Sequence, residues 1–259
     1  INIFVLDRNL KMLGAVEKFQ SLIWARRYNE VGQCEIALAA TTDNISMFTN
    51  GYYIFRSDDQ MLCRVQKLEI QTKADGANTL IITGQDVAGL LFQRIMRGVR
   101  ALSGNVRTFI IQRLTDECIS DSVYTDSADR YFTKANGQTL LEFSDPEDSF
   151  SEVNTDTMNC ANLGEKIQQY CKAFFWGYSV TWDRTNSKLC FNLYKGKDRS
   201  NSVLFSPRFD NLSSSKYVND LSKQGNVAVV SYIEPYAGYY VTGDYGTTDT
   251  SIDRYEFYV

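Results

Sequence analysis

Histidine is absent from this 259-residue sequence. Its absence removes the commonest general base, the usual imidazole metal ligand and every Ser-His or Cys-His nucleophile pair. The six cysteines include no CxxC pair, a spacing typical of zinc sites. We therefore expect a protein that is not an enzyme and that has neither a cofactor nor a metal site.

Long apolar runs are also missing, because no stretch approaches the roughly 20 apolar residues of a membrane-spanning helix. No secretion signal is visible at the N-terminus, and we expect no membrane partner. Synthesis in a reducing cytoplasm would keep all thiols free. The cysteines concerned are Cys34, Cys63, Cys118, Cys160, Cys171 and Cys190.

A concentrated basic face is missing as well. The chain has 27 basic and 31 acidic residues, so we expect no specific nucleic-acid binding. Many of the acids crowd into residues 144–156, where a glycosidase would instead need two carboxylates held rigidly beside one cleft. The surrounding proline and serines favour a solvated loop. The acids of this run are Asp145, Glu147, Asp148, Glu152 and Asp156.

Strand and turn patterns fill the chain up to Thr83. Apolar residues then recur at helical spacing over 87–95, 103–114 and 160–175, and Gly177 is expected to end the third helix. Strand patterns return after this glycine. Strands, helices and strands in this order predict an α+β fold with antiparallel barrel-like β-domains and a central helical segment. Four arginines are expected along the first two helices: Arg94, Arg97, Arg100 and Arg107.

Three domains follow from this order. Residues 1–84 form a barrel-like β-domain, residues 85–176 form a helical segment with an irregular insertion at about 120–156, and residues 177–259 form a second β-rich domain. The sequence stops at Val259 inside a predicted strand, so we expect the second β-rich domain to be truncated at its C-terminus.

Residues 19–38, FQSLIWARRYNEVGQCEIAL, predict an antiparallel hairpin. Gly32 supplies the positive φ that a tight turn often needs. The return strand points its alternate residues inward, which are Cys34, Ile36 and Leu38. Trp24 either anchors the core or joins Arg26 and Arg27 in an interface, since large aromatics and arginines are enriched in binding hot spots.

This hairpin resembles the N-terminal signature of the siphophage tail-hub family, the Gp37-like proteins that are similar to baseplate hubs. Two further segments resemble the family in the expected order. Thr83 to Asp86, followed by Leu90-Leu91 and Arg94-Ile95, is similar to its "GxD…LLxxRI" element. Phe205 to Ile233 is similar to its "N-L…Y…D-x-S…N-x-A-x-V" segment.

The resemblance implies a structural phage or prophage protein of the virion tail. It would form a homotrimeric hub at the tail tip, connect the tail tube to neighbouring tail proteins, and assemble in the host bacterial cytoplasm. The interface residues we expect are Trp24, Arg26, Arg27 and Arg94. Two alternatives stay open: the hub-like region of a tail-associated peptidoglycan-degrading enzyme, and a glycan-binding receptor module that uses the tyrosine-rich C-terminal end.

Ring closure would also cover exposed strand edges, which a monomer must otherwise shield. The predicted strands at 52–55 and 226–233 are apolar, and the second has no lysine or proline to discourage pairing. We therefore expect both strands to lie at sheet edges that neighbouring copies cover.

Overall fold

The computed structural model describes most of the chain. Two compact units are distinguished by their internal contacts, residues 1–197 and residues 198–259. Within unit 2, the strands are described by their backbone only. The described residues are 2–16, 18–72, 76–120, 130–144, 149–212, 214–216, 218, 227–234, 238–245 and 256–258.

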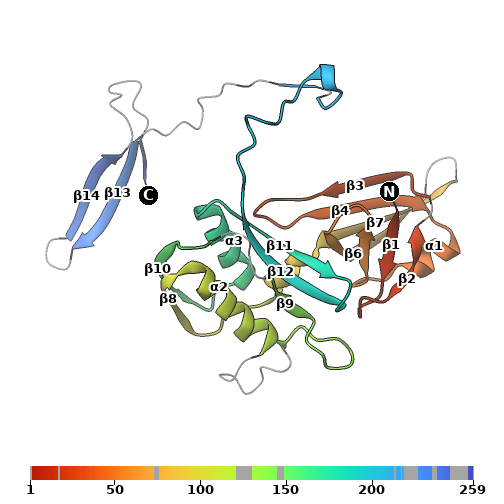
Figure 1. Ribbon diagram of the computed structural model, residues 1–259, viewed down its shortest axis with the longest axis horizontal. Helices are drawn as coiled ribbons and strands as arrows, with labels where there is room; N and C mark the ends of the chain where they lie inside the picture. Colours follow the sequence, from red (N-terminus) through yellow and green to blue (C-terminus); the bar gives the residue numbers. More distant parts are fainter. Residues whose placement is uncertain are drawn as a thin grey trace. The chain divides into compact units, whose positions relative to one another are not determined.

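A seven-stranded antiparallel sheet opens unit 1 (Figure 1). Its strand order is β2-β1-β5-β6-β7-β4-β3, so the sequence-adjacent strands β4 and β5 lie apart. A short helix, α1 (Thr42–Met47), connects them, with the Thr41 side chain as its N-cap. The strands are β1 (Ile3–Leu6), β2 (Met12–Val16), β3 (Ser21–Ala25), β4 (Gln33–Ala39), β5 (Tyr53–Arg56), β6 (Leu62–Thr72) and β7 (Asn78–Asp86).

Both faces of this sheet are buried near β1 and β5, because two apolar clusters pack against it. Val5 and Ile54 point into one cluster, which the other strands complete. Leu6 and Phe55 point into the second cluster, together with the helical part of unit 1. This double burial explains why β5 reads as an uninterrupted apolar run, YIF, and not as an alternating pattern.

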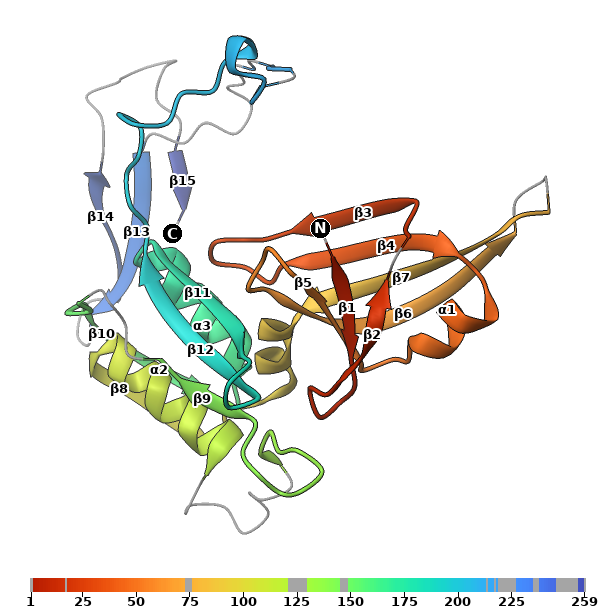
Figure 2. The ribbon, with the colours of Figure 1, turned by 45° about the vertical axis from the view of Figure 1, so that its right-hand side comes forward.

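Short helices follow the sheet and pack over its second cluster. The 3₁₀ helix η1 (Val87–Gln93) comes first, then α2 (Val106–Leu114), which continues as one π-helical turn, η2 (Thr115–Ile119). The third, α3 (Leu163–Ala173), contacts η1 and β11 and lies behind the β11–β12 hairpin in Figure 2.

Two small sheets complete unit 1. In one, β8 (Val99–Asn105) pairs antiparallel with β10 (Val153–Asn159). In the other, β12 (Lys188–Lys195) pairs antiparallel with β11 (Trp176–Asp183) and parallel with β9 (Leu141–Phe143).

Unit 2 contains the 3₁₀ turn η4 (Pro207–Phe209) and a three-stranded sheet. The middle strand, β13 (Val227–Glu234), lies between β14 (Gly238–Tyr245) and β15 (Glu256–Tyr258). The tyrosine side chains of these strands lie outside what the structure describes.

The predicted α+β fold is shown in part: the chain is mostly β with a few helices, while the predicted barrel closure stays a prediction. In the described part of the chain, β2 and β3 end an open sheet. Two expected edges are wrong: β5 pairs with both β1 and β6, and β13 pairs with both β14 and β15. The apolar sequences of these two strands therefore belong to interior strands of their sheets and not to edge strands.

Helix ends and helix content differ from several expectations. The helix predicted from residue 103 begins later, because Ser103 lies in β8 and Asn105 is the N-cap of α2. At the end of α3, Phe175 adopts φ +56° where a glycine is common, and Gly177 belongs to β11. The insertion predicted at 120–156 contains β9 and most of β10.

The arginines expected along two helices are spread over different structures. Only Arg107 lies in a helix, α2. Arg94 is the extended residue after η1, and Arg100 belongs to β8. The segment predicted as a helix over 87–95 is helical only as far as Gln93. It forms a 3₁₀ helix, which is typical of a short connecting segment.

Candidate functional site

The predicted interface group of the β3–β4 hairpin meets Asp59. Trp24 donates a hydrogen bond from its indole Nε1 to Asp59 Oδ2 at 2.9 Å, and Arg26 Nη1 lies 3.4 Å from Oδ1. The side chain of Asp59 is only 8% exposed and also accepts from the backbone N–H of Met61 at 3.0 Å. Asp59 therefore orders the side chains that the sequence singled out.

Trp24 packs against the core, as one of the two readings of the sequence expected, while its interface role stays a prediction. Its ring is half-buried and packs against the sheet cluster, and the Arg56 guanidinium carbon lies 5.5 Å from its centroid. It therefore helps cover the core but retains an exposed part on edge strand β3.

The connecting loop of this hairpin is attached to β11. Tyr28 donates from its hydroxyl to the carbonyl of Phe175 at 2.9 Å, and its own carbonyl accepts from the Tyr178 N–H at 3.2 Å. Its ring meets Tyr194 edge-on, with centroids 5.5 Å apart. The family-like hairpin thus joins the seven-stranded sheet to the second part of unit 1.

Charge pairs surround the same attachment. Glu30 lies between Arg27 at 3.4 Å and Lys172 at 2.6 Å. The hydrogen bond from Lys172 lowers the pKa of Glu30 below its usual value. Arg27 is therefore held on the outer side of the loop, with its side chain 47% exposed.

Gly32 in this hairpin is required for a different reason than expected. It is not among the residues with positive φ. A Cβ at this position would lie 2.5 Å from the Ala25 carbonyl oxygen and 2.9 Å from Met61 Sδ. The glycine permits close chain approach, and a positive-φ turn is not its role here.

Arg94 lies far from Trp24 in sequence and belongs to a second polar cluster. Its Nε donates to the Arg130 carbonyl at 2.7 Å, and its guanidinium stacks on Phe132 at 4.2 Å. Arg130 in turn pairs with fully buried Glu117. Burial is the first cause that lowers the pKa of Arg94, followed in this direction by the positive charge of Arg130.

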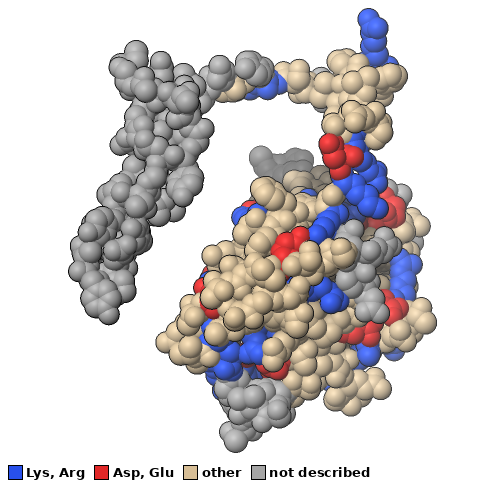
Figure 3. Space-filling model, turned by 60° about the vertical axis from the view of Figure 1, so that its left-hand side comes forward, with Lys and Arg blue, Asp and Glu red and all other residues tan. Residues whose placement is uncertain are grey.

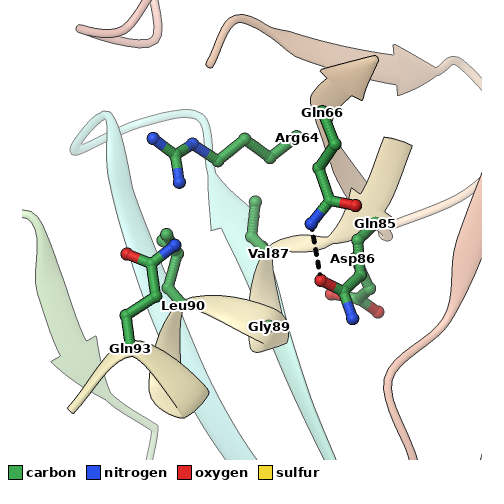
Figure 4. A pocket seen from close by; sticks show the side chains of 8 residues that line it. All are labelled: Arg64, Gln66, Gln85, Asp86, Val87, Gly89, Leu90 and Gln93. Atoms are coloured by element: carbon green, nitrogen blue, oxygen red, sulfur yellow. Dashed lines mark hydrogen bonds between the residues drawn. The ribbon is translucent and has the colours of Figure 1, made fainter. Parts of the chain in front are cut away.

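The GQD element predicted from the family resemblance lines a small crevice beside η1 (Figure 4). Gln66 Nε2 donates to Gln85 Oε1 at 2.7 Å, and Asp86 caps η1 by accepting from the Ala88 N–H at 2.9 Å. The crevice has a free volume of about 10 Å³, which is room for a single water. Its residues therefore shape the sheet-to-helix junction and offer no space for a small molecule.

The acidic run contains no pair of carboxylates facing a cleft in its described part. Glu152 pairs with Lys195 at 2.6 Å, and Asp156 pairs with Lys166 at 3.0 Å. Residues 145–148 of the run lie outside the described residues. The described carboxylates thus have local structural partners.

Two general properties of the described residues concern their charge distribution and the groups they lack. Lysines and arginines are interspersed with acids on the face shown in Figure 3, without one continuous basic surface. Among the described residues, no cluster of three potential metal ligands occurs, and the helices are all too short or too polar to cross a membrane.

Sequence reasoning missed Asp59, Tyr28, Glu117 and Arg130 as organising residues. The pairs Glu117–Arg130, Asp59–Trp24 and Tyr28–Phe175 are separated by 13, 35 and 147 positions in sequence, so no local spacing connects them. The only available signal was the hairpin motif itself, which contains Tyr28.

Comparison with known proteins gives a family match over nearly the whole chain. Residues 2–256 match the sequence family described as Siphovirus ReqiPepy6 Gp37-like protein. No curated protein matches the sequence.

Two solved structures share the fold. One is the prophage tail protein gp18 from Listeria monocytogenes EGD-e, with a TM-score of 0.52 and 14% identity over 95% of this chain and 68% of that one. The other is the tail protein from Neisseria meningitidis MC58, with a TM-score of 0.55 and 9% identity over 99% of this chain and 70% of that one. At these identities the likeness concerns the fold.

Proposed function

Because this chain belongs to the Siphovirus ReqiPepy6 Gp37-like family and is thus a phage tail protein, we propose that it forms the hub at the tail tip. The hub would be a structural homotrimer without enzymatic activity, connecting the tail tube to neighbouring tip proteins. It would assemble in the host bacterial cytoplasm. The fold shared with two phage or prophage tail proteins supports this assignment.

The observation that carries the proposal is the pair of edges that end the seven-stranded sheet. Neither β2 (MLGAV) nor β3 (SLIWA) contains a charged residue or a proline, the usual protections of an exposed edge. Apolar side chains are exposed on both, with Met12 at 52%, Leu13 at 48% and Ile23 at 52%. Both edges therefore favour pairing with another chain.

The direction of these edges favours a ring. All neighbouring strands of the sheet are antiparallel, so the first and the seventh strand run in the same direction. In a ring that continues the sheet from copy to copy, β3 of one copy would pair parallel with β2 of the next. This head-to-tail contact closes by cyclic symmetry and would complete the barrel that the single chain leaves open.

The interface residues of the proposal are those on or beside the β3 edge, together with Arg94. Trp24 lies in β3, Arg26 and Arg27 follow this strand directly, and Arg26 keeps 59% of its side chain exposed. Arg94 lines a shallow depression of about 300 Å³ with Ile95 and Arg97. We propose residues 1–84, 85–176 and 177–259 as the functional parts of the hub.

A charge placed on the β3 edge tests this function. We expect the full chain to form trimers with rising concentration in sedimentation and light scattering. Ile23→Lys should abolish association without changing the melting temperature, because it places a lysine on the edge. The control Ile70→Lys changes an equally exposed isoleucine of an interior strand and should leave association intact.

Three results would count against this proposal. They are a monomer at every concentration, a six-fold assembly, or equal effects of the two lysine variants.

A further inference from the structure

A groove of about 440 Å³ lies on unit 1, with Asp59 shared between its lining and the contact to Trp24 of β3, and with no residue of the Arg94 cluster in it. It forms where the β5–β6 connection and β9 face the β11–β12 hairpin. The isolated backbone bridge between Met61 and Thr181 holds these segments together. The side chains that matter for its chemistry are Phe55, Asp59, Glu142, Trp182, Asp183 and Arg184.

Two aromatic rings in this groove already hold a guanidinium group. Phe55 and Trp182 meet edge-on, with ring centroids 5.3 Å apart. The Arg184 guanidinium carbon lies 4.1 Å from the Phe55 centroid and 5.6 Å from that of Trp182. Ring faces at this distance attract cations, and arginine stacks well because its guanidinium is planar.

The charged side chains that line the groove are three carboxylates and one guanidinium, that of Arg184. Asp59 and Glu142 share their charge with Arg26 and Lys188, at 3.4 and 3.2 Å. Asp183 instead accepts hydrogen bonds from the Thr185 N–H and the Asn186 N–H and Nδ2, and its carboxyl also lies within hydrogen-bonding reach of Glu142. These bonds, with that from the Asn186 side chain as the largest cause, lower the pKa of Asp183, so its charge is retained.

Two of these carboxylates also lie close enough to the Cys190 thiol to affect its ionisation. The pKa of Cys190 is raised, first by burial and then by the negative charges of Glu142 and Asp183. An incoming cation would therefore be attracted to this part of the groove.

Arg184 has the properties of a replaceable occupant. It lies in the exposed turn between β11 and β12 and forms no ion pair with the three carboxylates of the groove. The Trp182 indole Nε1 beneath it is buried without an acceptor among the described residues. The groove thus contains a cation that uses only the ring faces and a donor that lacks a partner.

We propose that this groove binds an arginine side chain of a partner protein, which takes the ring-stacking position of Arg184. The incoming guanidinium stacks on Phe55 and Trp182 and pairs with Asp183. The turn lets Arg184 swing outward, and a carbonyl of the partner segment then accepts from Trp182 Nε1. This contact does not depend on how many copies form the hub, and it would attach a neighbouring tail protein.

The test is a titration of the full chain with N-acetyl-arginine amide, followed by the indole N–H signals in NMR spectra. The uncharged isostere N-acetyl-citrulline amide is the matched probe. We expect the Trp182 signal to shift with the arginine probe at millimolar concentration and not with citrulline. The Trp176 signal, from the opposite end of β11, should not move; Trp182→Phe and Trp24→Phe variants assign the three indole signals.

Arg184→Ala separates an occupant from a structural part of the groove. Removing a competing guanidinium should tighten binding of the arginine probe about fivefold, which corresponds to about 1 kcal/mol. Three results would overturn the inference: no shift of the Trp182 signal, equal shifts with both probes, or weaker binding by Arg184→Ala. Each would leave the hub assignment unaffected, because that is tested by the mass of the assembly.

Discussion

Asp86 is a buried carboxylate whose pKa in the folded chain differs from its pKa in the unfolded chain. Burial raises the pKa of its side chain to about 6, against 3.8 for an exposed aspartate. Between these values the folded chain holds a proton that the unfolded chain has released. Stability therefore falls as pH rises through this window, by up to about 3 kcal/mol.

Asp86→Asn should remove this pH dependence. Asparagine keeps the oxygen that caps η1 but carries no charge at any pH. We expect the variant to be more stable than the parent chain at pH 7 and similar to it below pH 4. Urea unfolding between pH 3.5 and 7.5 measures this, with the exposed Asp43→Asn as control. An unchanged pH slope in Asp86→Asn would contradict the assignment.

Glu117 is the second residue at which one charge matters. It is fully buried in the π-helical turn and pairs with Arg130, whose side chain is 16% exposed. Glu117→Gln removes the carboxylate charge of a buried ion pair and should cost about 3 kcal/mol of unfolding free energy. Glu69→Gln, which breaks an exposed pair with Lys67, should cost less than about 1 kcal/mol. Similar losses of unfolding free energy in the two variants would show that the buried pair of Glu117 stabilises the fold no more than an exposed pair does.

At the scale of elements, the loop after β3 attaches the seven-stranded sheet to the β11–β12 hairpin. Tyr28 reaches Phe175 and Tyr194, and the β11 backbone must come close enough to receive it. Gly177 permits this approach, since a Cβ there would lie 2.2 Å from the Tyr194 ring and 2.7 Å from the Tyr28 ring. The attachment therefore depends on a missing side chain in β11.

Gly177→Ala should push both rings away from β11. We expect a loss of about 1–3 kcal/mol, the usual cost of overpacking, measured by urea unfolding. Gly14→Ala in β2 is the matched control, because its Cβ would meet only the flexible end of Met47 at 3.4 Å. If both alanine variants unfold alike, the close packing of Tyr28 on β11 does not limit stability.

For the whole molecule, burial should determine how fast each of the six free thiols reacts with a labelling reagent. Cys160 is exposed and Cys190 is partly covered, while the other four are buried. Burial raises the pKa of Cys118 and Cys171 to about 12, so little reactive thiolate forms there at neutral pH.

Thiol labelling of the native chain should therefore show one fast site, Cys160. Denaturation without a reductant should release all six. Cys160→Ser should remove the fast phase alone, which identifies it. Fewer than six thiols after denaturation would indicate a disulfide, and rapid labelling of several sites would contradict the packing of unit 1.

Several elements could be predicted from the sequence because their causes are local. The alternation of Cys34, Ile36 and Leu38 places them on one face of β4, and the structure confirms that all three are buried. The N-cap of η1 also has a local cause, because Asp86 accepts from a backbone N–H only two residues away. Strand periodicity and capping involve residues that are neighbours in sequence, so they can be predicted without knowing which distant segments come together.

Only the tertiary structure decided which strands are edges and which residues organise the candidate surfaces. The apolar strand β5 was expected at an edge, but its partners β1 and β6 enclose it. Trp24 meets Asp59 across 35 positions, and Tyr28 meets Phe175 across 147. An apolar run satisfies an interior strand and a sticky edge equally well, so pairing between distant segments is what distinguishes them.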